Sequence, residues 1–254
     1  MPPLSTPAVV LRSLNYGESD RIVTFFTKDF GKLKGIAKGA RRSRKRFQNA
    51  LDLFSHVRLG FFEKERAGLV RIDSCDILQS FKGIREDLKK ICYGTYFLEL
   101  IDEMAGEREA HREAYDLLVF YLSSLEAAPP REEQLRIFET RTLSIFGFRP
   151  NLNRCDGCKK DWRELKDHPS LFFSIEKGAL VCDRCQGAMG LDLVPLSLGT
   201  ARLIEQISRM ELSKIERLRF TPQALIESRN LLGKFIVHQL GKELRSLKVL
   251  KEMG

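Results

Sequence analysis

Four of the six cysteines form two C-x-x-C pairs, Cys155 with Cys158 and Cys182 with Cys185, and 23 residues separate the pairs. Each pair can bend around one ion, and four thiolates complete the tetrahedral shell that Zn²⁺ prefers. A complete shell leaves no position for water, so the pattern predicts one structural zinc ion and not a catalytic metal. A redox-active dithiol, or a pairing without metal, stays open as an alternative.

The other cysteines and the histidines offer weaker chemistry. Cys75 and Cys92 lie in apolar periodic stretches, which is typical of unreactive core residues. The stretch from His111 to Glu113, ahead of Cys155, partly matches the H-x-E…P-C-x-x-C pattern of zinc nucleobase deaminases, but Arg154 stands where the proline is needed. We therefore expect His111 on the surface or in a loop before a helix, and we keep a metal-dependent enzyme only as an alternative. The remaining histidines match no ligand or triad spacing: His56, His168 and His238.

One segment carries nearly all of the net positive charge. From Lys28 to Arg46 there are nine basic residues and one acid, which gives +8 of the chain's total of +9. Clustered cations repel one another, and neutralising the phosphates of a nucleic acid is a simple use for them. The residues that we predict to contact DNA are Lys32, Lys34, Lys38, Arg41, Arg42, Arg44, Lys45 and Arg46. A solvated loop without a ligand, or a localisation signal, is the alternative.

Composition and motif searches narrow the function further. A chain of 254 residues with 43% hydrophobic and 30% charged residues has the composition of a folded protein with a sizeable core. It contains no P-loop, nucleophile elbow, dinucleotide fingerprint or zinc-protease helix motif, so we expect a protein that is not an enzyme. The longest stretch without charge, residues 117–130, is too short to span a membrane, and residues 1–11 do not resemble a secretion signal. We expect a cytoplasmic protein with reduced thiols.

The N-terminal third of the chain has the pattern of a small β-barrel. Five β-rich runs separated by turns precede any strong helical pattern, and we expect strands at residues 7–14, 21–27, 32–38, 54–63 and 69–77. Five strands in about 80 residues predict a closed barrel of the OB type. Such barrels bind single strands with cations and aromatic rings, and the rings available here are Tyr16, Phe30 and Phe47.

The rest of the chain has a helical pattern. After residue 82, apolar residues recur at spacings of three and four, which predicts amphipathic helices. The predicted fold class is therefore α+β. It comprises an OB-type barrel domain at residues 1–80, an α-helical domain at residues 81–149 and 191–254, and a four-cysteine zinc-knuckle insertion at residues 150–190.

The last helix has a basic face. Thr221 as N-cap and Pro222 at the first helical position predict a long helix that carries a leucine stripe as far as Leu247. An acidic segment of a partner protein could bind its basic residues, although a solvated face explains them as well. These candidate partner-binding residues are Arg229, Lys234, Lys242 and Arg245.

Two stretches are the most useful for recognising a protein family: residues 17–21, Gly-Glu-Ser-Asp-Arg, and residues 38–42, Lys-Gly-Ala-Arg-Arg. Together with the barrel, the helices and the cysteine pairs, they resemble the RecO family of bacterial DNA repair proteins over essentially the whole chain. The resemblance implies a protein of the RecF recombination-repair pathway that binds single- and double-stranded DNA and anneals complementary strands. It also implies contacts with RecR and with the acidic tail of single-stranded-DNA-binding protein, a functional link to RecF and RecA, and a place at the nucleoid. Because phosphate neutralisation does not separate DNA from RNA, an RNA-binding or ribosome-associated OB-fold zinc protein stays the alternative.

Overall fold

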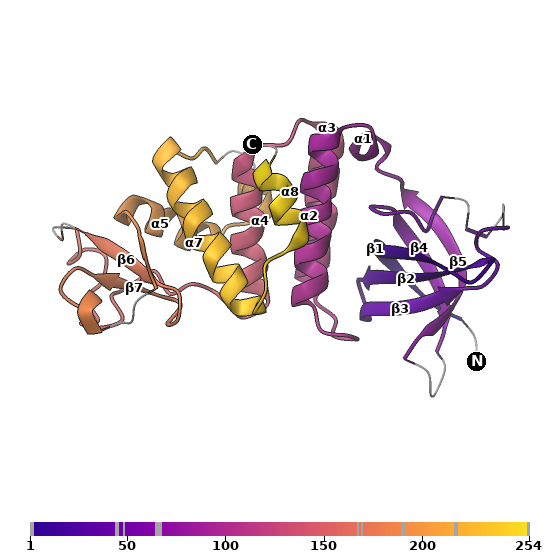
Figure 1. Ribbon diagram of the computed structural model, residues 1–254, viewed down its shortest axis with the longest axis horizontal. Helices are drawn as coiled ribbons and strands as arrows, with labels where there is room; N and C mark the ends of the chain where they lie inside the picture. Colours follow the sequence, from indigo (N-terminus) through magenta and orange to yellow (C-terminus); the bar gives the residue numbers. More distant parts are fainter. Residues whose placement is uncertain are drawn as a thin grey trace. The chain divides into compact units, whose positions relative to one another are not determined.

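The computed structural model describes residues 3–43, 46–47, 49–63, 68–166, 168, 170–188, 192–215 and 218–252. Contacts divide the chain into two compact units (Figure 1). The first unit comprises residues 1–130 and 244–254, and the second comprises residues 131–243. None of the described helices is long and apolar enough to cross a membrane.

The first unit begins with a closed barrel, as predicted. Its described strands are β1 (Leu4–Tyr16), β2 (Asp20–Thr27), β3 (Gly31–Ala37), β4 (His56–Phe62) and β5 (Val70–Gln79), which close in the order β1-β2-β3-β5-β4. Neighbouring strands are antiparallel except β3 and β5, which pair in parallel. Gly35 of β3 allows that parallel contact, because a Cβ there would lie 2.9 Å from the side chains of Val70 and Ile72.

Alternation along β3 explains how the barrel positions its cations. Leu33 and Ala37 point into the buried barrel core, while Lys32 and Lys34 lie on the outer side. The period-2 pattern therefore places every second residue of this lysine-rich strand outside the barrel. The cations on β3 and in the loop after it are held by a rigid scaffold.

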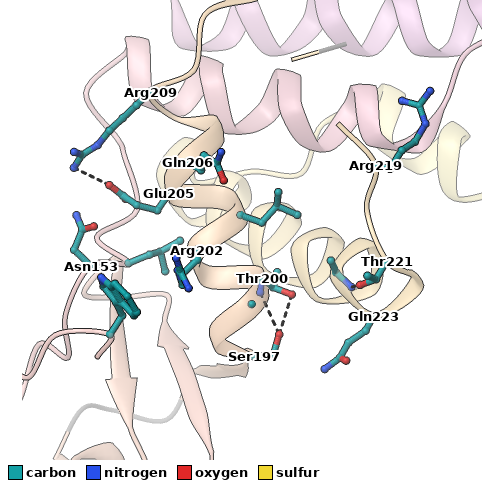
Figure 2. A pocket seen from close by; sticks show the side chains of 15 residues that line it. Asn153, Ser197, Thr200, Arg202, Glu205, Gln206, Arg209, Arg219, Thr221 and Gln223 are labelled. Atoms are coloured by element: carbon teal, nitrogen blue, oxygen red, sulfur yellow. Dashed lines mark hydrogen bonds and ion pairs between the residues drawn. The ribbon is translucent and has the colours of Figure 1, made fainter. Parts of the chain in front are cut away.

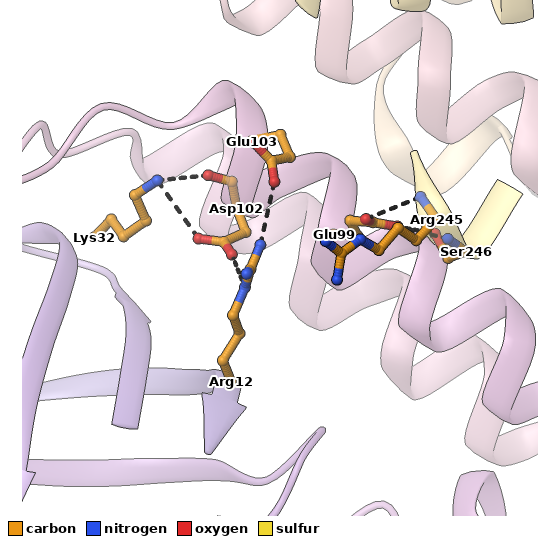
Figure 3. Close-up of polar contacts among 7 residues, drawn as sticks. All are labelled: Arg12, Lys32, Glu99, Asp102, Glu103, Arg245 and Ser246. Atoms are coloured by element: carbon orange, nitrogen blue, oxygen red, sulfur yellow. Dashed lines mark hydrogen bonds and ion pairs between the residues drawn. The ribbon is translucent and has the colours of Figure 1, made fainter. Parts of the chain in front are cut away.

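Helices complete the first unit: α1 (Lys82–Arg85), α2 (Leu88–Met104), α3 (Arg112–Ala127) and α8 (Arg245–Glu252). Asp87 caps α2 by accepting a hydrogen bond from the backbone N–H of Lys90. Glu99 of α2 caps α8 in the same way, because its carboxylate accepts the backbone N–H groups of Arg245 and Ser246 (Figure 3).

The second unit packs a small sheet against helices. Its helices are α4 (Glu132–Ile145), α5 (Leu198–Ile207), α6 (Leu212–Ile215) and α7 (Pro222–Leu240), with a 3₁₀ turn, η1 (Gln186–Ala188). The strands β6 (Leu171–Ser174), β7 (Ala179–Cys182) and β8 (Leu193–Pro195) form an antiparallel sheet in the order β7-β6-β8. Phe173 of this sheet meets Phe235 of α7 edge to face, with 5.2 Å between ring centroids, and so joins the two layers.

The prediction of one long C-terminal helix is wrong in its extent. Thr221 caps α7 as expected, but the helix ends at Gly241, whose left-handed φ of 67° is typical of a helix C-terminus. The leucine stripe beyond it, at Leu244 and Leu247, belongs to the first unit, where Leu247 is part of α8.

Candidate nucleic-acid interface and metal centre

The two most specific sequence stretches lie in contact at one end of the barrel. They are the β1–β2 turn and the basic loop, which we define as residues 38–46, of which residues 44 and 45 lie outside the described part of the chain. The carboxylate of Asp20 accepts the backbone N–H of Gly39 at 2.8 Å, and the backbone N–H of Arg41 donates to the carbonyl of Ser19 at 2.9 Å. The β1–β2 turn therefore fixes the backbone from which the loop cations project.

Asp20 is electrostatically suited to this role. The hydrogen bond from the backbone of Gly39 lowers the pKa of Asp20, and the hydroxyl of Ser19 and the charge of Lys38 act in the same direction against a smaller effect of burial. Gly39 has a φ of +67°, a conformation that glycine adopts without strain. Asp20 therefore stays ionised at neutral pH and anchors the start of the basic loop.

The described cations of the basic loop, Lys38, Arg41, Arg42 and Arg46, are all exposed. Arg41 donates to the carbonyl oxygen of Glu18 at 3.1 Å, and Arg46 donates to the carbonyl oxygen of Lys38 at 3.1 Å. Arg42 lies 3.8 Å from the carboxylate of Glu18, where side chains 75% and 93% exposed interact weakly. Because backbone carbonyls orient two of these side chains without cancelling their charge, the loop keeps a strong positive potential.

The two lysines of β3 differ from each other. Lys34 is exposed on the outer face of the strand and has no ion pair with a carboxylate among the described residues. Lys32 is only 18% exposed and pairs with Asp102 of α2, which also binds Arg12 (Figure 3). The charge of Lys32 is thus largely used to hold α2 against the barrel.

Other charged residues between Lys28 and Arg46 also form ion pairs that connect the barrel to the helices. Lys28 lies 3.2 Å from Asp116 of α3, and Asp29 accepts a hydrogen bond from Arg112 at 2.8 Å. The ring of His56 contacts the hydroxyl of Tyr115 at 2.7 Å between the barrel and α3. Lys28, Asp29 and Lys32 therefore fasten the barrel to the helices, whereas Lys34 and the described cations of the basic loop stay available.

Of the three aromatic rings that the sequence offers for stacking, one is more than half exposed. Phe47 is 4% exposed and belongs to the barrel core, and Phe30 packs edge to face on Phe61 with 5.3 Å between centroids. Tyr16, at the end of β1, is 55% exposed. It lies next to the turn that binds the basic loop, so a base could stack on it beside the loop cations.

The four predicted cysteine ligands come together in the second unit. Their sulfur atoms all lie within 4.8 Å of one another, and the Sγ atoms of Cys158 and Cys182 are 3.9 Å apart. A tetrahedral zinc site with Zn–S bonds of about 2.3 Å requires sulfur–sulfur distances of about 3.8 Å. The arrangement of the thiols fits a four-coordinate zinc ion.

Backbone geometry builds the two knuckles. Cys182 ends β7, and the N–H of Cys185 donates to its carbonyl at 3.0 Å, which closes a tight turn. In the other knuckle, the N–H of Lys159 donates to the carbonyl of Cys155 at 3.0 Å. The N–H of Cys182 also points at the Cys155 sulfur at 3.4 Å, which ties the knuckles together.

The thiols of the cluster differ in acidity. Burial disfavours the thiolate of Cys155, but backbone N–H groups around its sulfur, including that of Cys182, lower its pKa to about 7. Burial and the neighbouring thiol groups raise the pKa of Cys185 to about 12. Four thiolates this close together would repel one another, and a cation such as Zn²⁺ at the centre of the cluster would offset that repulsion.

His168, whose position in the sequence matches no ligand spacing, lies beside the cysteine cluster. Its ring nitrogen bonds to the carboxylate of Asp183, and both groups lie within 4.8 Å of the Cys182 sulfur. The loop before β6 brings His168 back to the second knuckle, a proximity that linear spacing does not reveal. Cys75 and Cys92 are buried away from this cluster, as predicted, and burial raises the pKa of both thiols.

The candidate partner-binding cations do not form one helix face. On α7, Arg229 bonds to Glu132 of α4 at 2.7 Å, and Lys234 lies 3.3 Å from Asp192. Lys242 follows the end of α7, and Arg245 begins α8 in the first unit. His111 stands at the N-cap of α3, in agreement with the expected loop position before a helix.

Comparison with known proteins decides the family. Residues 1–81 match the model described as "Recombination protein O N terminal", and residues 85–248 match "Recombination protein O C terminal". The chain belongs to the RecO family. Its relatives include proteins called DNA repair protein RecO from Syntrophus aciditrophicus, Desulfatibacillum aliphaticivorans and Pelobacter propionicus. They are 39%, 35% and 33% identical and align with 98%, 100% and 100% of this chain and with 95%, 98% and 98% of their own lengths. Membership of the RecO family gives this protein a role in DNA repair and recombination.

Proposed function

We propose that this protein is a non-enzymatic mediator of recombination repair that binds single- and double-stranded DNA and anneals complementary strands. The observation that supports the proposal most is the basic loop, where exposed cations project from a backbone fixed by Asp20. The residues that we propose as the DNA contacts are Lys34, Lys38, Arg41, Arg42 and Arg46, with Arg44 and Lys45 of the same loop. Lys32 is assigned to the barrel–helix contact instead.

Annealing follows from simple electrostatics. Two complementary strands are polyanions and repel each other, and a cluster of fixed cations lowers that repulsion when it neutralises phosphates. The bases stay free to pair, because phosphate contacts carry no sequence information. No proton transfer or nucleotide hydrolysis is needed for this step. Tyr16 would stack on an unpaired base of one strand and keep it exposed to its complement.

We propose that the four cysteines hold one structural zinc ion. Zinc would neutralise the clustered thiolates and lock the two knuckles of the second unit together. His168 and Asp183 would support the ligand Cys182 from outside the metal shell.

The wider assembly is also part of the proposal. The family resemblance supports a function in the RecF pathway, with RecR and the acidic tail of single-stranded-DNA-binding protein as direct partners. RecF and RecA would act at later steps, in which the recombinase RecA is loaded onto DNA covered by single-stranded-DNA-binding protein. These steps would take place in the cytoplasm, at the nucleoid. The division of the four candidate cations between α7, the residues after it and α8 argues against a basic face of α7 as the acidic-tail site.

The test is annealing of two complementary oligonucleotides with nucleotide omitted. Annealing should be faster with the wild-type protein than without it. A variant with Arg41, Arg42 and Arg46 changed to Gln should lose most of that acceleration. A parallel series with RNA strands examines the alternative: stronger binding of RNA than of matched DNA would favour an RNA-binding function. Unchanged annealing by the variant would contradict the assignment of the loop.

A further inference from the structure

The second unit contains a pocket that neither the basic loop nor the thiol cluster explains. It has a volume of about 700 Å³ and lies around α5, the chain that leads into α7 and the stretch around the first cysteine pair (Figure 2). This volume is within the usual range of ligand-binding pockets. Ten of its fifteen lining residues are polar or charged, so a ligand would meet hydrogen-bonding groups as well as apolar surface there.

The charges around the pocket favour an anion. Its lining includes Arg202, Arg209 and Arg219 but one acid, Glu205, which gives a net charge of +2. Glu205 is already engaged, because its carboxylate pairs with Arg209 at 2.8 Å and with Arg149. One negative charge shared by two arginines leaves the pocket electropositive.

Arg202 is the residue best placed to bind that anion. Its guanidinium lies over the indole of Trp162, 4.2 Å from the ring centroid, and this contact favours one orientation of the side chain; the guanidinium of Arg163 lies 5.3 Å from the same centroid. Arg202 forms no ion pair with a carboxylate in the part of the chain that the structure describes. A guanidinium ordered in this way offers hydrogen-bond donors to a phosphate and a flat face to a nucleobase.

The amide side chains in the lining indicate which chemical group of the ligand would bind beside the phosphate. Asn153, Gln206 and Gln223 line the pocket (Figure 2), and each amide offers both donors and an acceptor. Base edges present the same mixture of donors and acceptors. Leu152, Leu203 and Trp162 supply the apolar part of the lining, against which the flat face of a base can pack.

We propose that this pocket binds an unpaired nucleotide of a second nucleic-acid strand, with the phosphate on Arg202 and the base stacked against the Arg202–Trp162 pair. The inference rests on the proposed function and deepens it. A protein that brings two strands together needs a second contact, and the basic loop supplies the first. Asn153 and Trp162 flank the first cysteine pair, so the metal site would shape one wall of this pocket.

The sequence supplies a built-in reporter, because Trp162 is the only tryptophan of the chain. Titration with an eight-nucleotide thymidine strand should quench its emission to a saturating level. Free thymidine monophosphate at the same nucleotide concentration should quench it much less, since it lacks the neighbouring phosphates of a strand. Equal quenching by the free nucleotide, or stronger quenching by an aspartate-rich octapeptide, would overturn the proposal.

Variants separate this pocket from the basic loop. Arg202→Gln should weaken the affinity measured by Trp162 quenching about tenfold or more, which is the scale of losing one stacked base contact. The same variant should still bind a dye-labelled strand by fluorescence anisotropy and should keep its melting temperature. Arg229→Gln, which removes an arginine of the same unit outside the pocket lining, should change neither signal.

The two hypotheses fail differently. Normal anisotropy with no change in Trp162 emission, or with full quenching in Arg202→Gln, would overturn the pocket and leave the basic loop intact. Absence of any anisotropy change with the wild-type protein would overturn the proposed function itself. Annealing gives a second readout: Arg202→Gln should slow annealing at least several-fold while single-strand binding by the basic loop persists.

Discussion

Charge removal from the basic loop should change how DNA binding depends on salt. The four described cations of the loop, Lys38, Arg41, Arg42 and Arg46, are exposed and keep their charge. If each of the seven proposed DNA contacts meets one phosphate of a single strand, the slope of log affinity against log salt is about −5, at about −0.7 per contact. Changing Arg41, Arg42 and Arg46 to Gln removes three contacts, so the slope should become shallower by about 2.

This difference is large enough to measure. Between 50 and 200 mM salt, the wild-type protein should lose about 900-fold in affinity and the triple variant about 50-fold. Fluorescence anisotropy of a dye-labelled thymidine strand over five salt concentrations gives both slopes. The melting temperature of the variant should fall by less than about 2 °C, because exposed substitutions change stability little.

A matched control variant separates the effect of where charge is removed from the effect of how much charge is removed. The control changes Lys177, Arg229 and Lys234 to Gln, which removes the same net charge at exposed positions of the second unit. Its salt slope should equal that of the wild-type protein. The reasoning is refuted if the control and the loop variant have the same slope, or if the loop variant keeps the wild-type slope.

Three further predictions concern the metal, the barrel–helix contact and the loop anchor. Cys155→Ser, or removal of metal by a chelator, should release one equivalent of zinc and shift Trp162 emission; fresh protein without zinc would contradict the metal assignment. Asp102→Asn leaves Lys32 without a carboxylate and Arg12 with Glu103 alone, and we expect a loss of about 1–2 kcal/mol in the free energy of unfolding, less than for a fully buried pair because Arg12 is half exposed. An unchanged denaturant midpoint would argue against this contact. The pKa of Asp20 is lowered in the folded protein, so its contribution to stability is present above the ordinary pKa of 3.8 and is lost as the pH falls through the lower folded value. The NMR signal of the Gly39 amide should therefore titrate with a midpoint below 3.8. A midpoint at or above 3.8 would be inconsistent with the hydrogen bond between Gly39 and Asp20.

The barrel and the ligand set follow from the sequence because they depend on local patterns. Period-2 alternation in β3 fixes which residues lie inside the barrel, and the C-x-x-C spacing fixes the geometry of each knuckle. A capping threonine followed by proline marks the start of α7, and Gly241 marks its end. The extent of that helix could have been read from the glycine, but the continuing leucine stripe obscured it.

Long-range pairing is what the sequence does not reveal. Lys32 and Lys34 have the same local pattern, and they differ only because Asp102, 70 residues further on, lies beside Lys32. Phe47 stands in a basic stretch, yet its ring is buried in the barrel core. His168 reaches the second knuckle through tertiary contacts of a loop. Each of these features depends on which element packs against another, and no local spacing specifies that choice.

The most direct test of the central claim is amide hydrogen–deuterium exchange with and without a twelve-nucleotide thymidine strand. The claim is that the basic loop, anchored by Asp20, holds the phosphates of a nucleic acid. Bound DNA should slow exchange in peptides that cover residues 38–43 and the β1–β2 turn. Unchanged exchange in that region, with protection confined to other parts of the chain, would contradict the account.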